Sequence, residues 1–320
     1  MITRRSLALA GAGAALASGA RAAGWPERPV RVIIGYPAGG PTDLVGRLLQ
    51  EPLQRVWGQP VVIENRPGAS QIIASEAVAR SAPDGYTLLL AASTHTSNVV
   101  VQPRLPYDTI ADFTPICVLY ASPTVLFVGS SQPYRTVQDL IAAAKREPGM
   151  AFASSGNGSS GHFALEMFRR KAGIEVTHVA FRGAAPALQE VISGRVPATF
   201  STLSGAMGLL REGGLRALAV STPRRAPVLP DVPTLDEVGL SIPDTSPWYG
   251  FIGPKGLPQE VVQRVSRDSL ALMQDAALAA RIRDTGGLVI AEGPGPFAER
   301  IRSEIEGNRE MARVAGLRIE

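Results

Sequence analysis

Residues 32–43, VIIGYPAGGPTD, pass from a run of apolar side chains into a turn rich in glycine and proline. The apolar run Val30–Gly35 predicts a buried strand. The apolar pairs that follow the turn recur every four residues, as on one face of a helix. Thr42 or Asp43 is expected to cap that helix, and Pro52 is expected to kink or shorten it. The stretch therefore predicts a strand, a turn and a helix in succession.

The same alternation continues along the chain. Further strands are expected at residues 61–64, 87–91, 124–128, 150–153, 177–180, 198–200, 215–220 and 248–252. Further helices are expected at residues 72–80, 137–146, 162–172, 184–193, 258–275, 276–285 and 294–315. Strands that alternate with helices at this spacing are typical of βαβ units, so the sequence predicts an α/β fold with parallel sheets.

The elements divide into two α/β halves, each with a loop of small residues between a strand and a helix. Residues 122–128 and 248–252 are short apolar runs whose flanks belong to different halves, so we expect the chain to cross between the halves there. The second half would then be an insertion in the first. We expect residues 24–124 and 249–320 to form domain I and residues 125–248 to form domain II.

The first 23 residues have the pattern of a secretory signal. Arg4-Arg5 precedes a short apolar run from Leu7 to Ala17, and Ala20-Arg21-Ala22 offers a cleavage site with small residues at its ends. Thr3–Leu7 also resembles a twin-arginine signal, which is the alternative export route. The apolar run is too short to span the roughly 30 Å of bilayer hydrocarbon, so a membrane anchor is not expected.

Composition restricts the function further. The chain has 320 residues, of which 45% are hydrophobic and 19% charged, as in a globular protein with a sizeable core. Loss of Arg4, Arg5 and Arg21 with the signal lowers the formal charge from +4 to about +1. No dense basic block remains, which argues against nucleic-acid binding. Cys117 is the single cysteine, so it cannot form an internal disulfide.

Two loops suggest a binding site for an anion. The loop at residues 36–43 contains Gly39-Gly40, and the loop at residues 154–161 contains several glycines and serines; each leads into an expected helix. The first turn of a helix has free N–H groups and partial positive charge, which favour a carboxylate or phosphate. Ordinary βα turns are the alternative interpretation of either loop. Neither loop matches a dinucleotide or P-loop motif, so a nucleotide is not favoured.

Other candidate residues are scattered. Ser93 and Thr94 follow an expected strand, at the edge where open α/β sheets bind ligands, although they could be ordinary turn hydroxyls. Arg182 could pair with an anion or form a surface ion pair. His162 follows Ser159-Ser160, so a Ser–His catalytic pair is conceivable, but no nucleophile-elbow motif is present. The three histidines are too dispersed to indicate a metal site.

Several ordered motifs resemble one known family. They are Trp25-Pro26-Glu27-Arg28-Pro29-Val30, Tyr36-Pro37-Ala38-Gly39-Gly40-Pro41-Thr42-Asp43, Glu64-Asn65-Arg66-Pro67-Gly68-Ala69, Ala82-Pro83-Asp84-Gly85-Tyr86-Thr87-Leu88, Ser155-Gly156-Asn157-Gly158-Ser159-Ser160-Gly161-His162 and Leu229-Pro230-Asp231-Val232-Pro233-Thr234. Together they resemble the receptors of tripartite tricarboxylate transporters, often called Bug receptors, over essentially the whole mature chain.

The resemblance implies a periplasmic receptor with two α/β domains, joined by a two-stranded hinge, that close on a small carboxylate. Such a receptor is not an enzyme, uses no cofactor or metal, delivers its ligand to a membrane permease and is expected to be a monomer. With the two loops above, the expected ligand-binding residues are Tyr36, Pro37, Gly39, Gly40, Thr42, Asp43, Ser93, Thr94, Ser155, Gly158, Ser159, Ser160, His162, Arg182, Ser201 and Thr202. Asp43 is expected to cap the helix behind the glycines that donate to the ligand.

The chain departs from the family pattern in two places. Relatives often have Gly-Gly-Asn where this chain has Ser70-Gln71-Ile72, and they often have aspartate at the position of Ser201. These departures bear on which ligand is bound. Two other functions stay open from the sequence: a sensing receptor that docks on a signalling protein, and a secreted hydrolase that uses Ser159 or Ser160 with His162.

Overall fold

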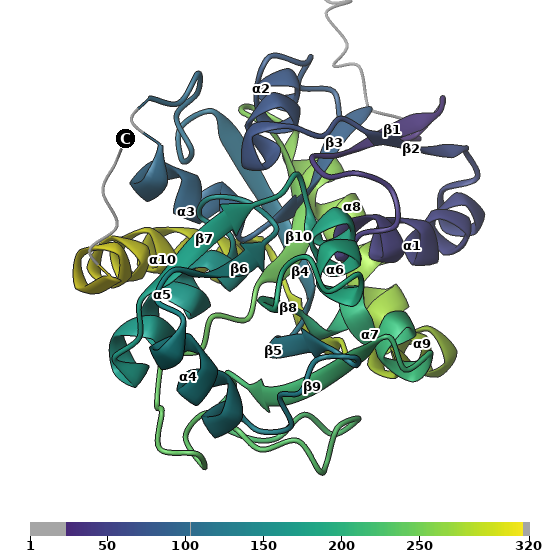
Figure 1. Ribbon diagram of the computed structural model, residues 1–320. Helices are drawn as coiled ribbons and strands as arrows, with labels where there is room; N and C mark the ends of the chain where they lie inside the picture. The colour runs from purple at the N-terminus through teal and green to yellow at the C-terminus, as the bar shows by residue number, and fades with distance from the viewer. Residues whose placement is uncertain (1–23, 103, 316–320) are drawn as a thin grey trace, which may run out of the picture.

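The computed structural model describes residues 24–102 and 104–315, which form two β-sheets, each packed between helices (Figure 1). The expected signal, residues 1–23, lies outside the described residues. Sheet A has six strands in the order β11-β4-β10-β3-β1-β2. Their bounds are β1 Val30–Ile34, β2 Val61–Asn65, β3 Thr87–Ala92, β4 Phe113–Ala121, β10 Trp248–Pro254 and β11 Leu288–Glu292.

Sheet B has five strands in the order β7-β6-β8-β5-β9. Their bounds are β5 Thr124–Gly129, β6 Met150–Ser154, β7 Val176–Ala180, β8 Ala198–Thr202 and β9 Leu215–Val220. Every residue of β5 is buried, because the strand lies inside a sheet that is covered on both faces. The part of the chain around sheet A is called domain I here, and the part around sheet B is called domain II.

Helices cover both faces of each sheet. In domain I, α1 Pro41–Trp57, α8 Gln259–Gln274 and α9 Ala276–Asp284 share one apolar core, whereas α2 Ile72–Ala79, α3 Thr94–Val101 and α10 Pro294–Ala315 lie against the other face. In domain II, α4 Val137–Arg146 and α5 Ser160–Ala172 cover one face, and α6 Ala184–Ile192 and α7 Leu203–Arg211 cover the other. A short 3₁₀ turn, η1 Ala69–Gln71, precedes α2. No helix within the described ranges is long and apolar enough to span a bilayer.

Two neighbouring segments connect the domains. The chain leaves sheet A at Ala121, enters sheet B at Thr124, and returns to sheet A at Trp248. The backbone N–H of Ser122 donates to the carbonyl oxygen of Pro247 over 3.1 Å, so the outgoing and returning segments lie side by side. This arrangement supports the expected two-domain α/β fold with a double connection.

The expected parallel sheets are in fact mixed. Strands β1, β2 and β3 are parallel, but β10 is antiparallel to both β3 and β4, and β11 is antiparallel to β4. In sheet B, β6 is parallel to β7 and β8, whereas β5 is antiparallel to β8 and β9. The reason is the connectivity, because β5 and β10 arrive from the other domain rather than through a helical crossover.

The first helix begins and ends differently from the expectation. Gly40 is the N-cap and Pro41 is the first helical residue, a position that suits proline, so Thr42 and Asp43 lie inside the first turn and neither is the N-cap. Pro52 does not shorten the helix, which continues to Trp57 and ends at Gly58. The apolar face formed by Val45, Leu49 and Leu53 packs into the core on both sides of the proline, and this packing outweighs the lost backbone hydrogen bond.

Candidate functional site

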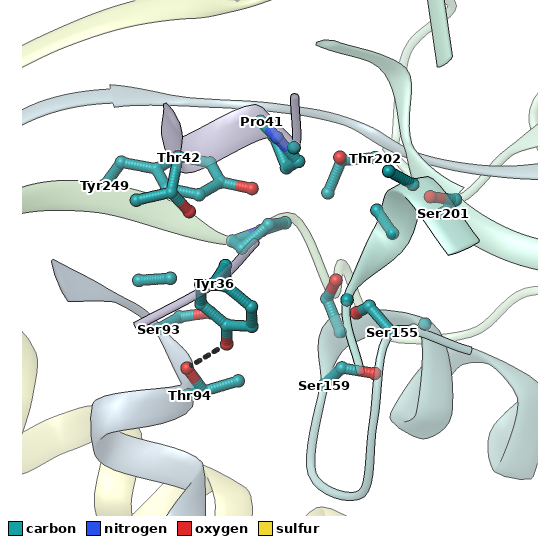
Figure 2. Close-up of a pocket in the computed structure, with 18 of the residues that line it drawn as sticks. Tyr36, Pro41, Thr42, Ser93, Thr94, Ser155, Ser159, Ser201, Thr202 and Tyr249 are labelled. Carbon is teal, nitrogen blue, oxygen red and sulfur yellow. Dashed lines mark hydrogen bonds between the residues drawn. The ribbon is translucent and has the colours of Figure 1, made fainter. Parts of the chain in front are cut away.

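A cavity lies between the two domains and is lined by both (Figure 2). It contains about 560 Å³ of space not filled by protein atoms, counted out to its open mouth. From domain I and the returning connection come Tyr36, Pro37, Gly40, Pro41, Thr42, Ala92, Ser93, Thr94, Pro247 and Tyr249. From domain II come Ser155, Ser159, Ser160, Gly161, Gly183, Ala184, Ala185, Ser201 and Thr202.

Five helices begin at this cavity. The N-cap residues of α1, α3, α5, α6 and α7 all line it, and they are Gly40, Ser93, Ser159, Gly183 and Thr202. Each helix N-terminus carries a partial positive charge of roughly half an elementary charge. The cavity therefore concentrates positive potential without a cationic side chain.

Several N–H groups in these first helical turns are free to bind a ligand. Those of Thr42, Gly161, Ala184 and Ala185 have no acceptor among the described residues, whereas the first-turn N–H groups of Leu203 and Ser204 in α7 donate to Pro123 and Ser122. Thr42 belongs to domain I and the other three to domain II. An anion between them would receive main-chain hydrogen bonds from both domains.

The side chains that line the cavity are uncharged at neutral pH. None of the lining residues is Asp, Glu, Lys, Arg or His. The Tyr36 hydroxyl and the Thr94 hydroxyl are hydrogen-bonded over 2.6 Å (Figure 2). Burial raises the pKa of Tyr36 to about 12, which outweighs the opposite effect of the bond to Thr94. Burial also raises the pKa of Tyr249, so both tyrosines stay neutral hydrogen-bonding groups.

Tyr249 packs on Tyr120, which in turn is hydrogen-bonded to the first residue of α1. Its ring stacks on Tyr120, with centroids 4.5 Å apart and planes at 15°. The Tyr120 hydroxyl donates to the carbonyl oxygen of Pro41 over 3.0 Å. The Thr202 hydroxyl lies on the opposite wall, is buried and makes no hydrogen bond of normal geometry among the described residues, although it lies near enough to Tyr249 to oppose the rise in that tyrosine's pKa. A polar ligand atom is therefore the natural partner for this hydroxyl.

Asp43 supports the site from behind. Its carboxylate accepts hydrogen bonds from the Gly39 N–H, the Arg47 guanidinium and the Asn65 side-chain amide, at 3.0, 2.9 and 3.0 Å. Burial alone would raise the pKa of Asp43, but these hydrogen bonds outweigh it and hold the pKa below its usual value. The Gly39 N–H is thus already used by Asp43, and neither residue lines the cavity.

His162 lies behind the loop before α5, and its ring is hydrogen-bonded to no serine hydroxyl within the described part of the chain. Its Nδ1 accepts the N–H of Gly158 over 3.1 Å, and its ring stacks on His178 at 3.9 Å between centroids. Burial, with smaller contributions from His178 and Arg169, lowers the pKa of His162 to about 3. The Ser159 hydroxyl accepts the His162 backbone N–H, so this serine is a helix cap.

The structure brings together most of the residues expected from the sequence. Eleven of them line the cavity: Tyr36, Pro37, Gly40, Thr42, Ser93, Thr94, Ser155, Ser159, Ser160, Ser201 and Thr202. Gly39, Asp43, Gly158 and His162 stand behind it, and the exposed Arg182 lies at a neighbouring hollow. No cluster of three or more potential metal ligands occurs within residues 24–102 and 104–315.

Sequence reasoning missed the start of α6 as part of the site. Gly183, Ala184 and Ala185 line the cavity, although only Arg182 was singled out from this region. A signal was present, because Gly183 stands between an expected strand and an expected helix, the same arrangement as in the two loops that were identified. For Trp248-Tyr249 the sequence left open a ligand site or a core, with the core favoured; Tyr249 lines the cavity, whereas Trp248 packs in the core.

Two α/β domains with a cavity between them are an architecture found in solute-binding proteins, although the fold alone does not assign the function. Among solved structures, the fold is similar to that of "R. palustris Rpa4515 with adipate", with a TM-score of 0.89, 34% identity, and coverage of 91% of this chain and 98% of that chain. It is also similar to MatC (Rpa3494) from Rhodopseudomonas palustris with bound malate, with a TM-score of 0.84, 30% identity, and coverage of 90% and 99%.

Sequence comparison identifies the family within that class. Residues 45–293 match the model of the tripartite tricarboxylate transporter family receptor. Protein BugT of Bordetella pertussis is 32% identical over 299 residues, which cover 92% of each chain. The chain therefore belongs to the tripartite tricarboxylate transporter receptor family. Its family and structural relatives are solute-binding receptors, so the chain is a receptor and not an enzyme.

Proposed function

We propose that this chain is a periplasmic receptor that binds a small carboxylate between its two domains and delivers it to a membrane permease. The observation that carries the proposal is the cavity itself, where five helix N-termini converge and no charged side chain intervenes. Such a site attracts an anion through main-chain N–H groups. The adipate and malate present with two relatives support a carboxylate as that anion.

In this proposal a carboxylate is held between the domains. The N–H groups of Thr42 and Gly161 donate from opposite sides, and those of Ala184 and Ala185 complete the set. The hydroxyls of Ser93, Ser155, Ser159, Ser160 and Ser201 line the path around the ligand, and the unpartnered Thr202 hydroxyl contacts a second polar group. Pairing of both domains with one ligand stabilises the closed form.

We also propose that the domains divide near residues 124 and 248 and hinge there. The two connections run side by side, and the Ser122 hydroxyl accepts the N–H of Ser204 at the start of α7 over 3.0 Å. Rotation about two adjacent extended segments opens and closes a cleft with few other changes. The expected export signal at residues 1–23 and the partner permease belong to the same proposal, and the family supports both.

Calorimetric titration of the mature chain, residues 24–320, tests the binding. Mono- and dicarboxylates are compared with their amides and with amino acids. Only carboxylates should bind. Denaturation in the presence of a ligand at 100 times its dissociation constant should then show a free energy of unfolding about 2.7 kcal/mol higher than without the ligand. Binding of the amides as tightly as the acids would contradict the proposal, because a neutral group gains little from helix dipoles.

Transport tests the delivery step. Deletion of the gene should abolish uptake of the identified carboxylate into whole cells, and restoration of the full chain with its first 23 residues should recover it. A chain without those residues should stay inside the cell and fail to restore uptake. Normal uptake in the deletion strain, combined with a binding-dependent change in gene expression, would instead favour the sensing role.

A further inference from the structure

The loop before α5 is bound by hydroxyl groups from the opposite domain. The Ser70 hydroxyl donates to the carbonyl oxygen of Asn157 over 2.9 Å, and the Ser97 hydroxyl donates to the carbonyl oxygen of Gly158 over 2.6 Å. Ser70 and Ser97 belong to domain I, whereas Asn157 and Gly158 belong to domain II. These two bonds can exist only while the domains are closed.

Both backbone polar groups of Gly158 are hydrogen-bonded, one within domain II and one to domain I. Its N–H donates to His162 Nδ1 within domain II, and its carbonyl oxygen accepts from Ser97 of domain I. Its φ of 71° lies in the left-handed region, and a Cβ there would stand 2.5 Å from Cγ2 of Val101. The position is therefore shaped to let the domain II loop touch α3 closely.

The segment that carries the Ser70 donor has an unusual backbone conformation. Ala69, Ser70 and Gln71 are consecutive non-glycine residues with φ of 46°, 50° and 77°. Such a conformation costs free energy and persists only when neighbouring contacts enforce it. Here the Asn98 side-chain amide donates to the Ser70 carbonyl oxygen over 2.8 Å, and the fully buried Gln71 side chain accepts the Ala92 N–H over 2.9 Å.

The loop that these hydroxyls hold also presents groups to the cavity. Ser155 and Ser159 line the cavity on either side of the Asn157–Gly158 segment, and neither Ser70 nor Ser97 lines it. The Ser155 carbonyl oxygen in turn accepts the N–H of Gly183, the N-cap of α6. The hydrogen bonds from Ser70 and Ser97 therefore fix the loop that leads into α5 and that also contacts the start of α6. Neither serine lines the cavity.

We propose that Ser70 and Ser97 are positioning residues that form an interdomain clasp, which fixes the ligand-binding loop of domain II and keeps the closed receptor from opening. The clasp deepens the proposed function and rests on it for its effect on ligand release. Because the clasp bonds form only after the domains close, they slow dissociation of the ligand. They do not contribute to the encounter of the ligand with the open cleft.

Stopped-flow binding of the carboxylate identified by titration tests this separation of rates. Ser70→Ala, Ser97→Ala and the double variant are compared with Ser193→Ala, whose hydroxyl makes the same kind of bond to a backbone carbonyl, that of Glu190, but within domain II. Each clasp variant should raise the dissociation rate roughly 2- to 10-fold, with the effects multiplying in the double variant, while the association rate should not fall, because a shift of the ligand-free receptor toward the open form exposes the cleft. Ser193→Ala should match the wild type in both rates.

A second measurement separates the clasp from the receptor function. Small-angle scattering of the ligand-free protein should give a larger radius of gyration for the double variant than for the wild type and for Ser193→Ala. If no carboxylate binds but the double variant still opens, the proposed ligand class fails and the clasp stands. If ligand binds and the double variant keeps both the wild-type dissociation rate and the wild-type radius, the clasp is refuted.

Discussion

His95, His162 and His178 are the three histidines of the chain, and all three are neutral in the folded protein at neutral pH. Burial lowers the pKa values of His95 and His178 to about 4 and that of His162 to about 3. An unfolded chain would protonate them near pH 6.5. Between pH 6.5 and about 4, the unfolded chain therefore binds protons that the folded chain does not, and folding becomes less favourable as the pH falls.

The free energy of unfolding should decline below pH 6.5, by about 1.4 kcal/mol per pH unit for each of these histidines. Urea denaturation at several pH values measures the slope. His178→Gln isolates one contribution, because the glutamine amide can replace Nε2 in the 2.6 Å hydrogen bond with Ser154 but cannot take up a proton. The variant should show a shallower decline than the wild type. Equal slopes would mean that His178 is already protonated in the fold.

At the residue scale, the sequence predicted residue types better than their roles. Hydroxyls and glycines were placed in the site because helix starts and anions require them. Asp43 was expected to cap α1, but Pro41 occupies the first helical position, so Asp43 is the third residue of the helix, and its carboxylate accepts the Gly39 N–H. His162 of α5 was expected at the ligand, but its ring stacks on His178 of strand β7, a contact that local sequence does not encode.

At the element scale, the start of α5 lies directly on β8. A Cβ at Gly161 would run into the carbonyl oxygen of Phe200, so Gly161→Ala must displace the helix start from the strand. We expect the free energy of unfolding to fall by roughly 1–3 kcal/mol, as for other overpacked sites. We also expect the affinity for the carboxylate to fall by about tenfold or more, which is about 1.4 kcal/mol, because the Gly161 N–H moves with the helix.

Gly208→Ala is the matched control for this substitution. Gly208 lies within α7, where a Cβ would have no heavy atom within 4 Å. Alanine should stabilise that helix by up to about 1 kcal/mol and leave the affinity unchanged. Thermal denaturation and calorimetric titration of both variants provide the comparison. If the two glycine substitutions behave alike, the close approach of α5 to β8 does not matter for binding.

The elements themselves were largely predictable where the apolar pattern was regular. The helix at residues 137–146 and the strand at residues 215–220 match the structure at both ends. Elements without a clear pattern were missed. Helix α3 has buried polar residues such as His95 and Asn98 on most of its surface, so it lacks an amphipathic signal. Strand β4 and helix α7 were missed as well, and β11 stands within a region that reads as helical.

At the scale of the whole molecule, the positive potential of the cavity comes from five helices rather than from titrating side chains. Affinity for a fully ionised dicarboxylate should therefore change by less than about twofold between pH 6.5 and 8.5, since Tyr36 titrates only near pH 12 and no charged residue lines the cavity. Calorimetric titration across this range measures it. An inflection within the range would place a titrating group at the ligand.

The overall architecture could be predicted only in part from the residues. The alternation of elements predicted two α/β units, and the short apolar runs at residues 122–128 and 248–252 predicted that the second is an insertion in the first. The resemblance to a receptor family added the expectation of a hinge. The antiparallel placement of β5 and β10 could not be read from local patterns. Each of these strands enters its sheet from the other domain, so its direction depends on how the two domains are joined.

The proposed use of main-chain N–H groups to hold an anion also bears on how such receptors diversify. Every residue except proline supplies an N–H group, so a substitution that keeps the helix starts in place leaves the proposed anion contacts intact. Residues such as Ala185 and Ser201 can therefore change in descendants of this gene and alter the shape offered to the remainder of the solute.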